Sequence, residues 1–186
     1  MVYLTGGSAK GTKLFSVPGK DVRPATSRMR ISLFDILRGQ MEDAVVVDLF
    51  AGTGSLGLEA LSRGASFASF FDTDARSISV LRKNLDKLKF VDRAALHQRS
   101  AFVAQTVLNR KVDFVFIDPP YPFYHEKPDE LEALGRAWSE GDLLSPEGLL
   151  LVEHPPQVGW GESLPGLQRI DERSYGGTVV SFYQRS

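Results

Sequence analysis

Short apolar runs alternate with amphipathic helical segments along most of this 186-residue sequence. The β-branched run at 45–47 predicts a buried strand, and residues 112–117 predict a second. Apolar residues at 78, 81, 85 and 88 keep the spacing of one helix face. Strands that alternate with helices are joined by crossovers, and crossovers give a parallel sheet with helices on both faces. The sequence therefore predicts a doubly wound, mostly parallel α/β fold.

The same patterns place the other elements. Residues 1–23 lack a helical period and contain the turn Pro18-Gly19, so a short hairpin or extended arm is expected there. Strands are expected at 45–47, 68–71, 94–97, 112–117, 149–152 and 179–183. Helices are expected from Thr26 or Ser27 to near Gly39, over 55–63, across 78–88, around 102–108 and from Pro128 to near Gly141. We divide the chain into a basic N-terminal arm, residues 1–25, and one domain, residues 26–186.

Charge is unevenly distributed along the chain. Residues 1–30 hold six basic side chains against the single acid Asp21, so this segment carries +5 although the whole chain carries −1. A cationic arm on a mildly acidic body suits a polyanionic partner. An ordinary solvated basic tail explains the same charge equally well, so charge alone leaves both readings open.

Several classes of protein are excluded or disfavoured by composition. The chain has no cysteine, which excludes disulfides and cysteine-ligated zinc. Its three histidines are scattered without metal-ligand spacing, so no metal is expected. No apolar stretch approaches the roughly 20 residues of a membrane span, and the N-terminus lacks the apolar core of a secretory signal. We expect a cytoplasmic protein.

A glycine-rich turn follows the first strong strand. The segment 48–54, Asp-Leu-Phe-Ala-Gly-Thr-Gly, opens a helix, and its glycines let the backbone approach a ligand closely. No Gly-Lys-Ser/Thr follows, which excludes a Walker loop. Asp48 would repel the pyrophosphate of a dinucleotide but would accept hydrogen bonds from a cationic or hydroxylated ligand.

A second acid, Asp72, ends the next strand at the spacing expected of a carboxylate that binds ribose hydroxyls. Two acids beside a glycine-rich turn suit a ligand with an adenosine moiety, a positive centre and no phosphate. S-adenosylmethionine is such a ligand. Taken singly, Asp48 or Asp72 is explained as well by helix capping or turn chemistry. Their placement after consecutive strands favours the ligand site.

The strand at 112–117 runs directly into Asp118-Pro119-Pro120-Tyr121. Two prolines stop the hydrogen-bond ladder and fix the turn, so the Asp118 carboxylate and the Pro119 carbonyl can both face the crevice. Two rigid acceptors beside an aromatic ring form a receptor for a planar base with an exocyclic amino group. Acceptors on the amine hydrogens free its lone pair and stabilise the charge that develops during alkylation. The alternative is that these four residues are only a rigid turn.

These motifs resemble the amino-methyltransferase branch of the Rossmann-like class I methyltransferases. More closely, the chain resembles the RsmD family of bacterial 16S rRNA guanine-N2 methyltransferases over nearly its whole length. The matching segments are 11–14, 23–34, 47–65, 82–85, 118–121, Glu153 and 175–178.

The resemblance implies S-adenosylmethionine-dependent methyl transfer to guanine N2 in 16S rRNA, on a small ribosomal subunit or an assembly intermediate, and hence a role in rRNA processing. The catalytic residues would be Asp118, Pro119, Pro120 and Tyr121. Cofactor-binding residues would be Asp48, Phe50, Ala51, Gly52, Gly54, Asp72, Thr73, Ser100 and Ala101. Lys10, Lys13, Arg23, Arg28 and Arg30 would contact RNA, and the three arginines have a second expected role in ordering the substrate-side helix.

One residue departs from the family pattern. The family usually has aspartate at the position of Ser100, where it contacts the adenine amino group. A serine hydroxyl accepts that hydrogen bond more weakly, so the departure predicts a weaker adenine contact.

Two other functions remain open. The same acceptors would serve the N6 amine of adenine in DNA or RNA, although the short chain has no inserted DNA-recognition domain. A non-catalytic RNA-binding scaffold is the third reading, and the intact glycine-rich turn and Asp-Pro-Pro-Tyr sequence disfavour it. The choice of guanine rests on the resemblance. We expect a monomer without metal or membrane partners.

Overall fold

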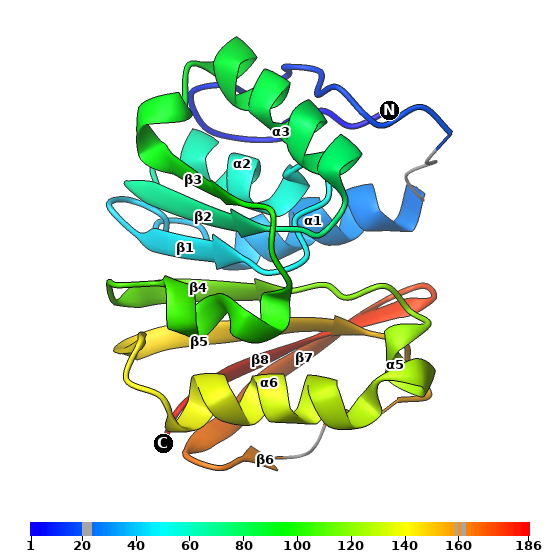
Figure 1. Cartoon of the computed structure of the whole chain (residues 1–186), viewed down its shortest axis with the longest axis vertical. Helices are drawn as coiled ribbons and strands as arrows, with labels where there is room; N and C mark the ends of the chain where they lie inside the picture. The colour runs from blue at the N-terminus through cyan, green and yellow to red at the C-terminus, as the bar shows by residue number, and fades with distance from the viewer. Residues whose placement is uncertain (20–23, 159, 161–162) are drawn as a thin grey trace.

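The computed structural model describes residues 1–19, 24–158, 160 and 163–186. Its centre is an eight-stranded sheet in the order β3-β2-β1-β4-β5-β8-β7-β6 (Figure 1). Strands β1 to β5 pair in parallel, and β8, β7 and β6 add antiparallel pairs to the β5 side. The strands are β1 (Val45–Asp48), β2 (Phe67–Phe71), β3 (Ala94–His97), β4 (Val112–Ile117), β5 (Leu144–His154), β6 (Ser163–Leu164), β7 (Leu167–Tyr175) and β8 (Thr178–Arg185).

Helices cover both faces of the sheet, as Figure 1 shows. One face packs against α1 (Pro24–Ile36), α2 (Ser55–Ser62) and α3 (Ala75–Leu88). The other packs against α4 (Ala104–Val107) and α6 (Pro128–Glu140), with α5 (Phe123–Glu126) and the 3₁₀ turns η1 (Val91–Arg93) and η2 (Ala101–Val103) in the connections. None of the helices described is long and apolar enough to cross a membrane.

Two hydrophobic cores lie on the two sides of the sheet. Successive residues of β4 alternate between them, since Phe114 and Phe116 join the core under α1–α3 while Val115 and Ile117 join the core under α6. Successive side chains of a strand point to opposite faces of the sheet, and both faces of β4 are buried. Residues 112–117 are therefore almost continuously apolar in sequence. The predicted doubly wound, mostly parallel α/β fold is confirmed.

Several element predictions need correction. Helix α1 begins at Pro24, so Thr26 and Ser27 lie within its bounds and not before its first residue; proline suits the first turn because its missing N–H has no partner there. The helix expected around 102–108 is split into η2 and α4. Strand β7 is absent from the expected strands because its residues are mostly exposed and polar, without the apolar run that marks a buried strand.

The N-terminal residues pack onto the sheet-covering helices. Tyr3 and Lys13 form an isolated antiparallel β-bridge, which agrees with the expected hairpin. Val2, Leu4 and Leu14 are each at most 3% exposed and belong to the core under α1–α3. The boundary at residue 25 between arm and domain stays a prediction.

A buried carboxylate holds this N-terminal segment, α1 and α2 together. Glu59 of α2 is fully buried and accepts hydrogen bonds from the Thr5 backbone N–H (2.9 Å), the Thr5 hydroxyl (2.7 Å) and Arg63 Nε (2.8 Å). Arg30 of α1 lies 3.6 Å from it and donates to the Tyr3 carbonyl at 2.7 Å. We call Thr5, Arg30, Glu59 and Arg63 the Glu59 cluster. It ties three segments that are distant in sequence.

Candidate active site

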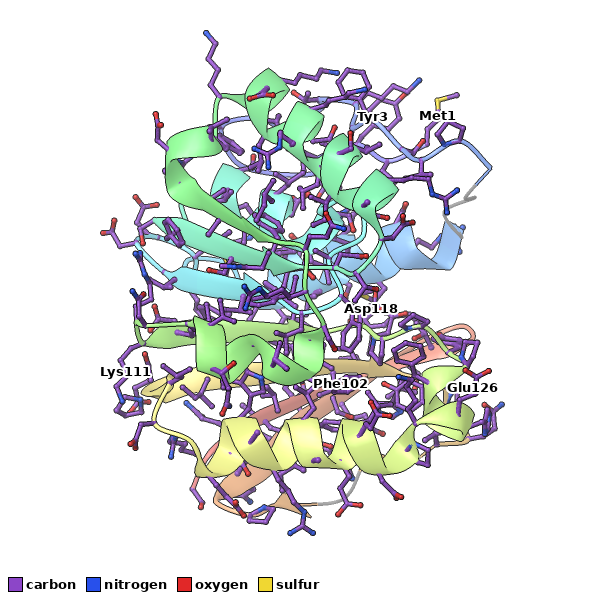
Figure 2. The ribbon with its side chains drawn as sticks, viewed as in Figure 1. Met1, Tyr3, Phe102, Lys111, Asp118 and Glu126 are labelled. Carbon is purple, nitrogen blue, oxygen red and sulfur yellow. The ribbon has the colours of Figure 1, made fainter. Side chains whose placement is uncertain are left out.

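A cavity of about 530 Å³ opens where the parallel strands end. Its walls come from the segments that follow β1, β2, β3 and β4, from the end of β5 and from the turn between β7 and β8. Figure 2 shows Lys111 and Asp118 at opposite ends of β4, and the cavity lies at the Asp118 end. Open α/β sheets bind ligands at the carboxyl ends of their strands, so this is the expected place for a site.

The glycine-rich turn and Asp72 form one wall. Phe50, Gly52, Asp72 and Thr73 line the cavity. The Gly52 N–H donates to Asp72 Oδ2 at 2.7 Å, and the Asp74 N–H donates to Oδ1 at 2.7 Å, so the carboxylate is held in a fixed orientation. Gly52 has a φ of 54°, and no atom lies within 4 Å of the position that a Cβ would take. The backbone is therefore open to a ligand that lies across it.

Asp48, Ala51 and Gly54 are not among the residues that line the cavity. Asp48 is 2% exposed and accepts the Gly57 N–H of α2 at 3.1 Å. Gly54 has a φ of 89°, and a Cβ there would come within 2.3 Å of Leu81. These residues support the conformation of the turn on the side away from the cavity. A direct cofactor contact by any of them stays a prediction.

Asp48 also has an unusual acidity. Its pKa is raised from 3.8 to about 7, mainly by burial and to a smaller extent by the nearby Asp72 charge, while hydrogen bonds from the N–H groups of Gly57 and Phe50 limit the rise. A carboxyl group whose pKa is higher in the folded than in the unfolded protein favours folding less as pH rises between the two values. Folding stability is therefore expected to fall between about pH 4 and pH 7 because of this group.

The Asp48→Asn variant tests this linkage, since an amide oxygen can still accept the Gly57 N–H but does not titrate. The unfolding free energy of the wild type relative to the variant should drop by about 2 kcal/mol between pH 5 and pH 7, measured by urea denaturation. Asp43→Asn, an exposed site just before β1, controls for the loss of one negative charge. A flat difference would show that Asp48 is ionised throughout this range.

Ser100 and Ala101, which follow β3, also line the cavity. The Ser100 hydroxyl accepts the Phe102 N–H at 3.3 Å and caps the short η2 turn. A hydroxyl already engaged in capping remains able to donate to a ligand or to accept a second bond.

The Asp118–Tyr121 turn forms the opposite wall, and all four of its residues line the cavity. The Tyr121 hydroxyl donates to the Gly177 carbonyl at 3.3 Å, which ties this turn to the β7–β8 hairpin. Figure 2 shows Phe102 below Asp118 in the view, and both residues line the cavity. The structure thus brings together the turn that would hold a base and the turn that would hold the cofactor.

An aromatic cluster flanks the cavity. Phe50, Phe102 and Phe123 approach one another with ring centroids 6.2 to 6.5 Å apart, and Lys127 lies over two of these rings. All four residues line the cavity, together with Arg99. Apolar rings beside cations suit a ligand that combines flat rings with negative charge.

Sequence reasoning does not assign several of these lining residues. Leu49 belongs to the glycine-rich turn but is given no role of its own. Arg99, Phe102, Phe123 and Lys127 carry no motif, and only the folded loops bring them to the cavity. Glu153, Gly177 and Thr178 belong to segments that match the family resemblance, but the sequence alone gives them no role. The place of Glu153 at the carboxyl end of a strand permits a site-lining role from sequence but does not assign it a chemical one.

The residues predicted to contact RNA are distributed unevenly. Lys10, Lys13 and Arg28 are exposed, whereas Arg23 lies outside the described residues. The predicted RNA contact of Arg30 is wrong in this structure, because its side chain is 2% exposed and belongs to the Glu59 cluster. Arg30 instead fits the second role expected of it, which is to fix helix α1.

Comparison with known proteins gives a match over residues 2–184 to the family described as Conserved hypothetical protein 95. Over 182 residues, 96% of each chain, the sequence is 33% identical to YlbH of Bacillus subtilis, named as a candidate rRNA methyltransferase. It is 31% identical to ribosomal RNA small subunit methyltransferase D of Escherichia coli strain K12, over 99% of this chain and 90% of that protein. The solved structure of Escherichia coli yhhF, described as a candidate methyltransferase, superposes with a TM-score of 0.84 at 30% identity, covering 100% of this chain and 98% of that one.

Proposed function

Because this chain belongs to the RsmD-like methyltransferase family, described as Conserved hypothetical protein 95, we propose that it methylates the exocyclic N2 of a guanine in 16S rRNA with S-adenosylmethionine as donor. One observation carries the proposal. The Asp118–Tyr121 turn and the Gly52–Asp72 pair line the same cavity, although they follow different strands. A methyl donor and an amino acceptor bound at these two walls would meet inside it.

The cofactor wall fits S-adenosylmethionine. A volume of about 530 Å³ lies within the roughly 300–1,000 Å³ typical of small-molecule sites. Each Asp72 oxygen accepts one backbone N–H and keeps acceptor capacity for ribose hydroxyls. Gly52 leaves open backbone beside it, and Phe50 offers an apolar ring. When bound, the cofactor supplies an electrophilic methyl group on a sulfonium.

The chain's own residues position the acceptor amine. The Asp118 carboxylate and the Pro119 carbonyl accept hydrogen bonds from its two hydrogens, while Tyr121 stacks on the base. This arrangement turns the nitrogen lone pair toward the donor and stabilises the positive charge that forms on nitrogen during attack. Asp118 need not be a strong base, because the alkylated amine is acidic and releases its proton after transfer.

The surroundings of the cavity suit a flipped-out nucleotide. Arg99 and Lys127 line it and would attract phosphate, and the rings of Phe102 and Phe123 would stack on bases or pack under them. Exposed Lys10, Lys13 and Arg28 add positive charge on the N-terminal segment and α1. These features support an RNA substrate of which only one base enters the cavity.

The decisive experiment incubates the protein with labelled S-adenosylmethionine and unmethylated small ribosomal subunits, naked 16S rRNA or duplex DNA. Nucleoside analysis then identifies the product. N2-methylguanosine in rRNA is the expected result. N6-methyladenosine would overturn the guanine assignment, and no transfer to any substrate would favour the non-catalytic scaffold.

Charge reversal on the basic surface tests the RNA interface. Changing Lys10, Lys13 and Arg28 together to glutamate should weaken rRNA binding and lower the slope of log affinity against log salt by about 0.7 for each phosphate that is no longer neutralised. Filter binding over a salt series measures both quantities. Lys111→Glu, at the far end of β4 from Asp118 (Figure 2), is the matched control and should leave the slope unchanged. An unaltered slope in the triple variant would remove this surface from the interface.

A further inference from the structure

Two carboxylates from adjacent strands belong to the lining of the cavity. Ile117 of β4 pairs in parallel with Val152 of β5, so the next residues along the two strands, Asp118 and Glu153, are neighbours across the sheet. Both line the same cavity. The proposed function uses Asp118 and leaves Glu153 without a role.

Glu153 is held in a defined position. Its side chain is largely buried, at 8% exposure, and Oε1 accepts a hydrogen bond from the Thr178 hydroxyl of β8 at 2.9 Å. Its backbone carbonyl accepts the Tyr124 hydroxyl of α5 at 2.5 Å. Thr178 of β8 thus holds the carboxylate, and Tyr124 of α5 holds the backbone that carries it. A fixed charge discriminates between ligands better than a mobile one.

The bases differ in the group that adjoins their amine. In guanine the N2 amine is next to N1–H, so two donor groups lie in a row on the Watson–Crick edge. In adenine the N6 amine is next to N1, and in cytosine the N4 amine is next to N3; both ring nitrogens are acceptors. A carboxylate beside the amine receptor would accept from N1–H of guanine but would face a lone pair in adenine or cytosine.

We propose that Glu153 selects guanine by accepting its N1–H while Asp118 and Pro119 hold its N2 amine. The inference rests on the proposed function and deepens it, because the Asp-Pro-Pro-Tyr turn alone does not distinguish one amino-bearing base from another. Thr178 then acts as a positioning residue that orients the carboxylate. The carboxylate would repel the ring-nitrogen lone pair of adenine or cytosine as well as attract N1–H of guanine, and both effects contribute to the selection of guanine.

A purely structural role for Glu153, as a tie between β5 and β8, makes a different prediction. In the Glu153→Gln variant the amide oxygen can still accept the Thr178 hydroxyl, so the tie survives while the negative charge is lost. The amide also gains an N–H that can donate to a ring nitrogen. A structural role predicts an equal change for every base, whereas the selecting role predicts a change in preference.

The test uses 2-aminopurine, which keeps the 2-amino group but has a bare N1. The methylated position is first mapped with the wild type, and subunits are reconstituted with guanine or 2-aminopurine there. Wild-type protein should prefer guanine roughly 100-fold in kcat/KM, the magnitude of one hydrogen bond to a charged acceptor. Glu153→Gln should reduce that preference to within a few-fold. Glu147→Gln, at the exposed beginning of the same strand, should behave as the wild type.

Three results would overturn the inference. If Glu153→Gln lowers kcat/KM equally for guanine and 2-aminopurine, Glu153 only connects β5 to β8 and does not select the base. Wild-type methylation of 2-aminopurine as fast as guanine would show that N1–H is not read, and this result needs no variant to fold. Absence of any guanine methylation by the wild type would overturn the proposed function itself and would remove the basis for this inference.

Discussion

Replacing Asp118 by alanine is expected to reduce methyl transfer by about 1,000-fold while S-adenosylmethionine still binds. The carboxylate lines the cavity at the end of β4, and the proposal gives it an amine hydrogen and the positive charge that develops on nitrogen. Removal of one preorganised electrostatic group from a transition state typically costs about 100- to 1,000-fold. Single-turnover transfer to small subunits measures the loss, and calorimetric titration with S-adenosylmethionine measures binding.

The matched control is Asp118→Asn. Asparagine keeps an acceptor oxygen at the same place, so transfer should fall only about tenfold if Asp118 works by hydrogen bonding. If both variants lose activity equally, Asp118 acts through its charge or as a base. Loss of cofactor binding in Asp118→Ala would show that the residue belongs to the other wall of the cavity.

Replacing Glu59 by alanine is expected to destabilise the protein by about 3–5 kcal/mol, the usual cost of breaking a buried ion pair by removing one partner. Glu59 is fully buried, and its loss would leave Arg30, at 1% exposure, without its countercharge. Burial already lowers the Arg30 pKa, which shows that the surroundings disfavour its charge. The backbone N–H and hydroxyl of Thr5 would lose their acceptor as well. Urea denaturation measures the change in unfolding free energy.

The pair Glu132–Arg136 provides a control with the same helical spacing as Glu59–Arg63. Its atoms are 2.9 Å apart, but both side chains are more than half exposed. Glu132→Ala should therefore change stability by less than about 1 kcal/mol. If Glu59→Ala lowers the unfolding free energy by less than about 1 kcal/mol, the buried Arg30 must find water or another acceptor in the variant.

The elements that sequence reasoning predicts well are those whose local chemistry matches their final surroundings. Strands β1 and β4 are buried on both faces, and a continuous apolar run is their direct signature. Helix α6 begins with Pro128 at its first position, as predicted, and ends at Glu140, next to Gly141. Strand β7 has no such signature, because its partner β8 determines its conformation.

The site is predictable to the extent that it follows strand ends. The glycine-rich turn, Asp72 and Asp118–Tyr121 each follow a strand that the sequence predicts. All of them contribute to the lining of one cavity, although Asp48, Ala51 and Gly54 of the turn do not line it themselves. Glu153 lies there because β5 pairs in parallel with β4, whereas Gly177 and Thr178 become part of the site only through the pairing of β5 with β8. Arg30 is a residue that sequence reasoning assigns to the RNA surface and that the structure buries. Its charge suggests a surface residue, and only the distant Glu59 explains its burial.

The position of β8 in the sheet has a consequence for how the chain is made. Strand β8 follows β5, β6 and β7 in sequence, yet it lies between β5 and β7 in the sheet. Until residues 167–185 are synthesised, β5 is an edge strand with the apolar residues Leu149–Val152 and unpaired backbone groups on its open side. Such edges recruit other chains into aggregates. A nascent or truncated chain that lacks the β7–β8 hairpin is therefore expected to aggregate more readily than one that contains it.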